Sequence, residues 1–255
     1  MSKRSLLNRL LPALGLLLVL TANGLANALP LNGQTTGEIS DSFEVLFVPA
    51  GYVFSIWGLI YLGLTGYTVY QLLPAQRSDQ RLQAISLPFL ISSLANSAWI
   101  FLWHYEFFPA TLLAMITLLV TLIVIYQRLD IDREKAGAAE TWLTRVPFQV
   151  YLGWVSVATI ANVTSVLDYL NWGGWGLSDP TWAVIMLAAA VLLAGLVGWT
   201  RKDLAYLAVF IWALAGIAVE QSQQPLVAYA SWVGAGLTAA FLLLAAVRKL
   251  RPQEI

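Results

Sequence analysis

Eight long apolar runs dominate this chain and restrict what it can fold into. Between breaks rich in charged residues, Gly, Pro or Asn, the runs cover residues 8–28, 47–73, 83–104, 107–127, 145–168, 180–199, 204–221 and 225–247. Each is near the length of about 20 mostly apolar residues that a helix needs to cross a bilayer. Hydrophobic side chains make up 59% of the 255 residues and charged ones only 11%, which excludes an ordinary soluble domain.

The runs predict helices rather than strands. The strands of a membrane β-barrel would show segments of about ten residues with alternating polarity, whereas these runs are longer and do not alternate. A helix also satisfies its own backbone amides within hydrocarbon. We therefore predict an all-α fold, a polytopic membrane bundle of eight spans, with the lipid bilayer as its partner.

The basic residues predict the orientation of the bundle. All fourteen Lys and Arg residues fall on one side of the eight-span arrangement. The other side has none of them and holds Glu38, Asp41, Glu44, Glu106, Asp168, Asp179 and Glu220. Because Lys and Arg in short loops stay cytoplasmic, we expect a multi-pass protein of the inner (plasma) membrane with both termini in the cytoplasm. The formal net charge of +0 leaves no basic surface for nucleic acid.

The first run has two interpretations. Its basic start, its apolar stretch and the sequence Ala26-Asn27-Ala28 resemble a cleavable signal peptide. We expect the run to be retained as the first membrane helix, and cleavage is the alternative.

The composition also limits the chemistry. There is no cysteine and only one histidine, so no disulfide, thiolate metal site or histidine cluster for zinc is expected. No nucleotide-binding loop or Ser/His/Asp set is visible, and no catalytic residue or metal site is predicted. We expect a protein that is not an enzyme. His104 is expected to be an interfacial histidine at the outer end of the third span, and a haem axial ligand is the alternative.

Three spans carry aromatic and polar residues on one helical face. The faces consist of Trp57 and Tyr61 in the second span, of Asn96, Trp99 and Trp103 in the third, and of Trp154, Ala158 and Asn162 in the fifth. Residues three, four or seven apart lie on the same side of a helix. Pro49 fits the first turn of the second helix. The faces are explained either by close helix packing, in which small and amide residues bond neighbouring helices, or by a pocket for a flat ligand.

These residues resemble the TspO/MBR family of tryptophan-rich sensory proteins, which is related to the translocator protein. The matching positions are Pro49, Tyr52, Val53, Trp57 and Tyr61 in the second span, Asn96 and Trp99 in the third, and Tyr151, Trp154, Ala158, Thr159 and Asn162 in the fifth. Tyr52 stands where the family has Trp, and the cholesterol-recognition run of the family's fifth helix is absent. The resemblance covers about residues 5–170.

The resemblance implies a five-helix unit over residues 1–172, with a three-helix extension over residues 173–255. The unit is expected to hold a pocket closed by the loop of residues 29–46. Its ligands would be tetrapyrroles such as protoporphyrin or haem, with no cofactor required. The implied binding residues are Tyr52, Trp57, Tyr61, Asn96, Trp99, Trp103, Trp154, Ala158 and Asn162. We expect the extension to serve packing or dimerisation, which leaves a homodimer open.

Two functions follow as expectations. The first is a membrane sensor or receptor that binds a hydrophobic ligand in the aromatic pocket. The second is a transporter that moves such a ligand across the membrane, for which Glu220 and Asn162 are the only polar hints along a path. Enzymatic breakdown of a porphyrin ranks last, because no acid, base or metal set is visible.

Overall fold

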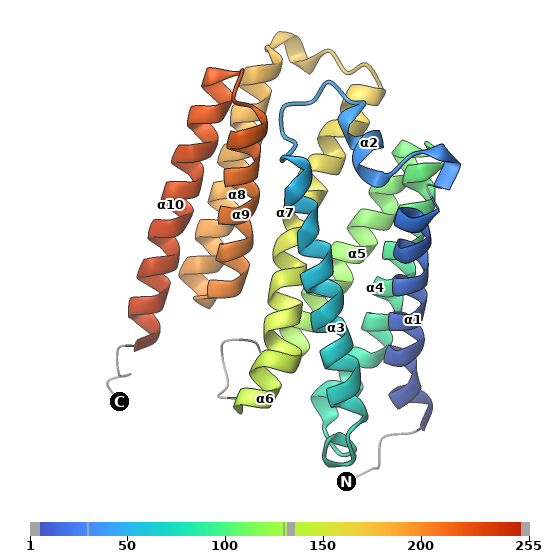
Figure 1. Ribbon diagram of the computed structural model, residues 1–255. Coiled ribbons are helices and arrows are strands. Elements are labelled where there is room, and N and C mark those ends of the chain that lie inside the picture. The colour runs from blue at the N-terminus through green and yellow to red at the C-terminus, as the bar shows by residue number, and fades with distance from the viewer. Residues whose placement is uncertain (1–5, 30, 130, 132–135, 251–255) are drawn as a thin grey trace.

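The computed structural model describes residues 6–29, 31–129, 131 and 136–250. Within these residues all regular structure is helical, and the long helices run side by side (Figure 1). They are α1 (Leu6–Ala28), α3 (Ile56–Leu72), α4 (Gln80–His104), α5 (Phe108–Arg128), α7 (Val146–Tyr169), α8 (Asp179–Arg201), α9 (Leu204–Glu220) and α10 (Pro225–Leu250). The predicted all-α, polytopic membrane bundle is confirmed.

Each of the eight predicted spans corresponds to one of these helices. Seven helical segments of the described chain are long and apolar enough to cross a membrane, whereas α9 has 17 residues. About 17 residues is the lower limit for a spanning helix. The observed ends lie within a few residues of the predicted ones, except at the start of the second span.

The second span begins later than the sequence predicts. A 3-10 turn covers Gly51–Ser55, and the α-helix starts only at Ile56. Pro49 therefore precedes the helix instead of occupying its first turn. The reason is a contact with a distant segment. The N–H of Ala50 donates to the carbonyl oxygen of Gly216 in α9 at 3.2 Å, and this bond holds Ala50 in an extended conformation (φ −53°, ψ 145°) that cannot belong to a helix.

Shorter elements connect the long helices. The connection between α1 and α3 contains a 3-10 turn at Leu31–Gly33 and the helix α2 (Thr36–Asp41), which packs on α4. The other short elements are 3-10 turns at Pro74–Gln76 and Gly174–Gly176, the helix α6 (Ala138–Glu140) and a π-helical turn at Thr141–Arg145 that leads into α7. Figure 1 shows α2 at the end of the bundle opposite the start of α1 and the end of α10.

The long helices form a ring with a three-helix group beside it. Successive contacts close α1, α3, α7, α5 and α4 into the ring, in that order. Helix α9 packs on α7, and α8 and α10 pack against α9 (Figure 1). Helix α7 therefore belongs to both parts of the molecule.

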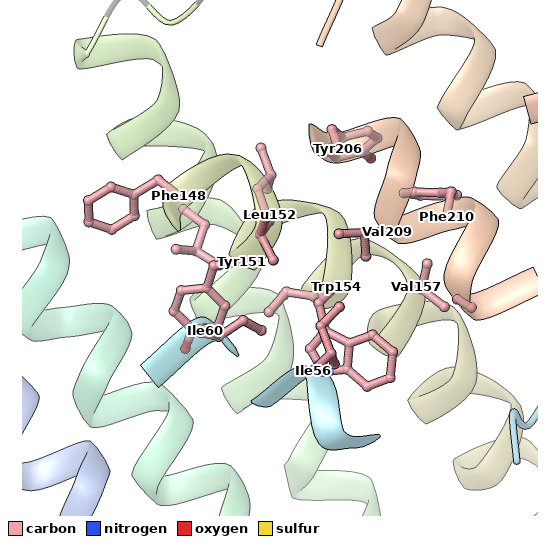
Figure 2. Packing of buried hydrophobic residues seen from close by; sticks show 14 of the residues in the cluster. Ile56, Ile60, Phe148, Tyr151, Leu152, Trp154, Val157, Tyr206, Val209 and Phe210 are labelled. Atoms are coloured by element: carbon pink, nitrogen blue, oxygen red, sulfur yellow. The ribbon is translucent and has the colours of Figure 1, made fainter. Parts of the chain in front are cut away.

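One hydrophobic core runs through α7 from α3 to α9. Figure 2 shows side chains of α7 that pack on one side against Ile56 and Ile60 of α3 and on the other side against the aromatic residues of α9. Gly153 allows the close approach of α7 and α9, because a Cβ there would lie 3.1 Å from Val209 Cβ and 3.3 Å from the carbonyl oxygen of Tyr206. The ring and the three-helix group thus share their core.

Polar contacts also join the ring to the three-helix group. The Tyr126 hydroxyl of α5 donates to Asp203 Oδ2 at 2.9 Å, and the Tyr206 hydroxyl donates to Ser156 Oγ at 3.1 Å. Asp203 is fully buried and caps α9 by accepting from the N–H of Tyr206 at 3.0 Å. The start of α9 is therefore fixed to the ring by hydrogen bonds as well as by packing.

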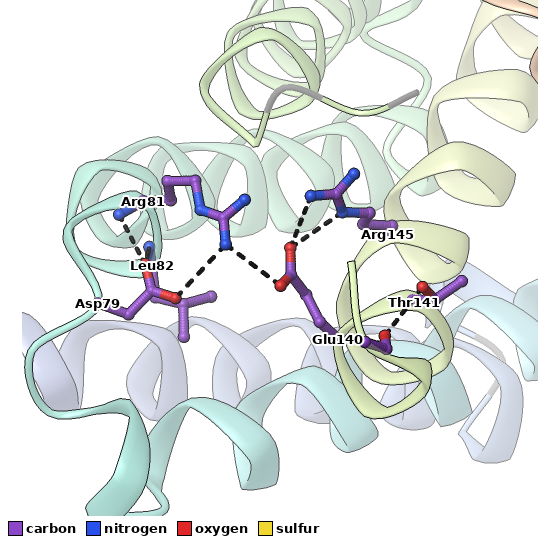
Figure 3. A network of polar contacts seen from close by, with 7 residues as sticks. Asp79, Arg81, Leu82, Glu140, Thr141 and Arg145 are labelled. Carbon is purple, nitrogen blue, oxygen red and sulfur yellow. Dashed lines mark hydrogen bonds and ion pairs between the residues drawn. The ribbon is translucent and has the colours of Figure 1, made fainter. Parts of the chain in front are cut away.

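Glu140 links two arginines at the end of the bundle where α1 begins and α10 ends (Figure 3). Its carboxylate oxygens lie 3.2 Å from Arg81 Nη2 and 2.8 Å from Arg145 Nη2. Asp79 caps α4 by accepting from the N–H groups of Arg81 and Leu82. This network ties the start of α4 to the segment that leads into α7.

The two ends of the bundle differ in charge. The described basic residues all lie at the end that carries Glu140, on the first or last turns of the helices or in the loops between them. The seven acidic residues that the sequence places on the other side lie at the opposite end with α2. The sorting of charge found in the sequence is therefore present in the folded chain.

Candidate functional site

A pocket opens between α2, the turn before α3, and helices α3, α4, α5 and α7. It outlines about 650 Å³, including space open to solvent, and the lining side chains carry no charge. The lining residues are Thr36, Ser40, Phe47, Val48, Pro49, Phe54, Trp57, Trp99, Trp103, Met115, Trp154, Val157, Ala158, Ala161, Asn162 and Ser165. An apolar, aromatic cavity with a few polar groups is the usual form of a small-molecule site.

Tryptophan rings from three helices form the walls of this pocket. Trp57 of α3 meets Trp154 of α7 edge to face, with ring centroids 6.2 Å apart and planes at 86°. Trp99 and Trp103 of α4 stack on each other at 5.2 Å and 18°. Phe54 packs edge-on against Trp154 at 5.8 Å. These are favourable geometries for aromatic pairs, so the walls are held in place by contacts among themselves.

Two polar groups in the walls have no protein partner. The indole nitrogens of Trp99 and Trp154 are buried, and no acceptor among the described residues lies within hydrogen-bonding distance of either. A buried donor without a partner loses the bonds that water would give it. Both indole N–H groups therefore stand without a protein acceptor in side chains that line the pocket.

Asn162 is oriented by its neighbour on α5. Its side-chain amide donates to Thr111 Oγ1 at 2.9 Å, and the Thr111 hydroxyl lies 3.2 Å from Asn162 Oδ1. Both side chains are buried. The amide thus lines the pocket in a fixed orientation.

The structure brings six of the nine predicted binding residues together around the pocket. They are Trp57, Trp99, Trp103, Trp154, Ala158 and Asn162. Tyr61 lies behind the wall, stacked on Trp57 with ring centroids 5.5 Å apart. The helical spacing that places Trp154, Ala158 and Asn162 on one face also explains their common orientation.

Asn96 lies outside the pocket lining and bonds three helices together. Its Oδ1 accepts from Asn23 Nδ2 of α1 at 2.8 Å, and its Nδ2 donates to the Tyr151 hydroxyl of α7 at 3.1 Å. The residue is almost completely buried. This arrangement corresponds to the packing interpretation of amide residues in membrane helices.

Tyr52 also lies outside the lining. It is 50% exposed, and its ring packs edge-on against Trp212 of α9 at 5.3 Å. The indole nitrogen of Trp212 donates to the carbonyl oxygen of Val53 at 3.2 Å. Helix α9 thus holds the turn that leads into the pocket wall, through Tyr52, Val53 and the bond between Ala50 and Gly216.

Sequence reasoning missed several lining residues. Ala161 and Ser165 continue the face of Trp154 and Ala158 by one further turn, and extending the helical period would have found them. Thr36 and Ser40 lie four residues apart on α2, whose start the capping-box sequence Thr35-x-x-Glu38 would have signalled, whereas Phe47 lies outside any helix in the connection between α1 and α3.

Helix α2 covers the pocket and is fastened to the end of α4. The indole nitrogen of Trp103 donates to the carbonyl oxygen of Thr36 at 3.3 Å, and Asn32 Nδ2 donates to the carbonyl oxygen of His104 at 2.9 Å. His104 is buried, and its ring nitrogens lie 2.8 Å from the carbonyl oxygen of Ile100 and 3.5 Å from Thr36 Oγ1. The lone histidine therefore contacts the cover instead of lining the pocket.

A capping box stabilises the start of α2. Thr35 Oγ1 accepts from the N–H of Glu38 at 3.3 Å, and the N–H of Thr35 donates to Glu38 Oε2 at 2.7 Å. Each bond satisfies a backbone or side-chain group at the helix start. These bonds lower the pKa of Glu38 below its ordinary value. The larger effect comes from the backbone N–H of Thr35 and the smaller one from the Thr35 side chain.

No group of three or more His, Cys, Asp or Glu side chains among the described residues is placed to hold a metal ion. The pocket lining likewise contains no histidine, acid or base. What the lining offers is aromatic ring faces and one oriented amide.

Comparison with known proteins gives one match. A family model described as TSPO-like protein matches residues 9–244. The match continues beyond residue 170, where the motifs of the five-helix unit end, through α8 and α9 and into α10. The comparison found no matching curated protein and no matching solved structure.

Proposed function

Because the chain belongs to the TSPO-like protein family, we propose that it binds a tetrapyrrole-like or other flat hydrophobic ligand in the pocket beneath α2. The observation that carries this proposal is the meeting of tryptophans from α3, α4 and α7 around one apolar cavity. A ligand there acts as a signal or a cargo, and no catalytic step is assigned to the protein.

The chemistry of the walls supports a flat, largely apolar ligand. A ring system between Trp57 and Trp154 would bury apolar area, which is favourable by about 25 cal/mol per Å². Ala158 is small enough to leave room for it, and the indole N–H groups of Trp99 and Trp154 offer donors to its acceptor atoms.

The charge of the cover limits how an anionic ligand would enter. Glu38, Asp41 and Glu44 lie in the connection that contains α2, at the end of the bundle where the sequence places no basic residue. Like charges repel. A porphyrin would therefore bind with its carboxylates turned away from α2, and a less anionic ligand would bind more tightly.

Tryptophan fluorescence tests the proposal directly. Protoporphyrin added to the purified chain in detergent should quench the emission of the wall tryptophans in a saturable manner. Trp154→Ala should weaken binding at least about tenfold, because it removes one ring face and one donor. Trp232→Ala, which removes an exposed indole of α10, is the matched control. Absence of saturable quenching, or equal affinity for Trp154→Ala and the parent, would overturn the proposal.

The orientation in the membrane belongs to the same proposal. We assign the basic end to the cytoplasm, as for other membrane proteins, and the pocket cover to the outer side. The chain has no cysteine, so single replacements give a clean test. Exposed Ser178 at the acidic end and exposed Ser78 at the basic end are suitable positions. In intact cells, an impermeant maleimide should label Ser178→Cys and leave Ser78→Cys unlabelled, and the reverse pattern would invert the assignment.

Transport of the ligand is the second candidate. Polar side chains continue inside the ring beyond the pocket, from Asn96 to Asn23 and Tyr151, and a moving ligand needs such groups along its path. Proteoliposomes containing the protein should then accumulate protoporphyrin faster than empty vesicles. Equal rates would leave binding as the function.

A further inference from the structure

A second cavity lies at the acidic end, outside the ring. It outlines about 720 Å³, including space open to solvent, between the end of α7, the segment of residues 44–47 and the start of α8. Its lining includes the carboxylates of Glu44, Asp168 and Asp179 and the rings of Trp172 and Trp182. Phe47 lines both cavities, so the segment of residues 44–47 separates them.

Two tryptophans form an aromatic wall in this cavity. Trp172 and Trp182 lie with ring centroids 4.9 Å apart, and Trp175 packs against both at 5.4 Å and 5.7 Å. The indole nitrogen of Trp182 donates to the carbonyl oxygen of Gly174 at 2.7 Å. The rings of Trp172 and Trp182 are therefore held beside the cavity.

The turn that carries this wall has an unusual backbone. Gly174, Trp175 and Gly176 have φ values of 57°, 51° and 79°. A bulky residue such as Trp rarely adopts a positive φ, and such conformations persist where the surroundings hold them, often at binding sites. The bond from Trp182 is one contact that holds this turn.

Three carboxylates line the same cavity without a positive partner. Glu44, Asp168 and Asp179 are exposed, and none of them forms an ion pair with a described residue. No Lys or Arg lines the cavity, and the described basic residues lie at the other end of the bundle. The negative potential is therefore not neutralised locally.

We propose that this cavity binds a monovalent organic cation with apolar substituents, such as a quaternary or alkylated ammonium group. Indole faces attract such cations through the π-electrons of the ring. The carboxylates add long-range attraction, and Val45, Leu46 and Met186 offer apolar surface to the substituents. A small metal cation would need several oxygen ligands at short range, and the described acidic residues form no such group. The site is separate from the proposed ligand pocket and depends on α8.

Benzyltrimethylammonium is a suitable probe. Titrated calorimetrically into the full chain in detergent without lipid, it should bind saturably, more tightly than benzyl alcohol, and more weakly as salt concentration rises. The triple variant Glu44→Gln/Asp168→Asn/Asp179→Asn should lose about tenfold or more in affinity, because three attractive charges are removed. Trp172→Leu should also weaken binding.

Two controls separate this proposal from the first one. Glu220→Gln removes an exposed carboxylate at the same end but outside the cavity and should leave the affinity unchanged. The melting temperature of the triple variant in detergent, compared with that of the parent, reports whether the fold is intact, whether or not the chain binds protoporphyrin. A triple variant that melts like the parent and also binds the probe like the parent overturns the proposal, as does a probe that binds no better than benzyl alcohol.

The natural cation has two sources, a soluble molecule or the choline headgroup of a lipid. Nanodiscs of phosphatidylcholine and of phosphatidylethanolamine, which both carry no net charge, distinguish them. A lipid headgroup in the cavity would compete with the probe only in phosphatidylcholine, whereas equal probe affinity in both indicates a soluble cation.

Discussion

The backbone N–H of Ala50 donates to the carbonyl oxygen of Gly216 in α9, which lies 3.2 Å away and 166 residues later in the chain. This bond fixes the turn of the pocket wall to α9. Val53 packs so tightly on Gly216 that a Cβ at residue 216 would overlap Val53 Cγ2. Helix α9 is therefore a structural part of the pocket, although none of its residues lines it.

The first prediction concerns this contact. Gly216→Ala should destabilise the protein by about 1–3 kcal/mol, the usual cost of overpacking, and should weaken protoporphyrin binding by shifting the turn at residues 51–55. Thermal unfolding in detergent measures the first effect. Gly236→Ala on α10 is the control, because a Cβ there meets no atom within 4 Å. Equal melting temperatures for Gly216→Ala and the parent would contradict the prediction.

The second prediction concerns the pocket itself. Ala158→Leu should reduce protoporphyrin affinity at least about tenfold while the protein stays folded, because the larger side chain fills the space beside Trp57 and Trp154. Ala240→Leu, at an exposed position of α10, makes the same change outside the pocket. If both variants bind protoporphyrin equally, Ala158 does not face the ligand.

The third prediction concerns the link between the ring and the three-helix group. Tyr126→Phe removes the bond to buried Asp203 and should cost about 1–3 kcal/mol, because a buried carboxylate loses one of its hydrogen bonds. Denaturant unfolding measures the cost, with Tyr229→Phe at an exposed position of α10 as the control. A double-mutant cycle with Asp203→Ala should be non-additive, and purely additive losses would show that the bond contributes nothing.

The fourth prediction concerns the pocket cover and pH. The pKa of Glu38 is lower in the folded chain than its ordinary value. The capping bond therefore stabilises α2 fully at pH values above the ordinary pKa of a glutamate. This stabilisation is lost as the pH falls through the pKa that Glu38 has in the folded chain. Hydrogen exchange at the Thr35 amide should therefore lose protection at acidic pH.

Glu38→Gln is the matched variant, because glutamine also closes a capping box but does not titrate. Its Thr35 protection should be independent of pH in the acidic range. Asp41→Asn should behave like the parent, since Asp41 takes no part in the box. The same acid sensitivity in Glu38→Gln would assign the effect to another group.

Much of the fold was predictable because membrane spans are local features. Length and hydropathy alone define each helix. The basic residues, which all fall on one side of the eight-span arrangement, indicate that successive helices run in opposite directions. The faces formed by Trp57 with Tyr61 and by Trp154 with Ala158 were also predictable, because helical geometry fixes which residues share a side.

The remainder depends on contacts between distant segments. Hydropathy extends the second span to residue 47, but the bond from Ala50 to Gly216 replaces its first turn and directs Tyr52 to Trp212. Phe47 reaches the pocket from the part of the connection that is not helical, so helical spacing does not predict its position. The positions of these side chains follow from contacts between distant segments, and local sequence patterns do not predict such contacts.

The contacts of α9 with the pocket wall also set an order of events in biosynthesis. Helices inserted in sequence can assemble the ring once α7 has been made, yet Ala50 and Val53 bind partners at residues 216 and 212. Contacts between such distant residues form late. The turn at residues 51–55 therefore reaches its final position only after nearly the whole chain has left the ribosome, and the pocket is the last part of the ring to be completed.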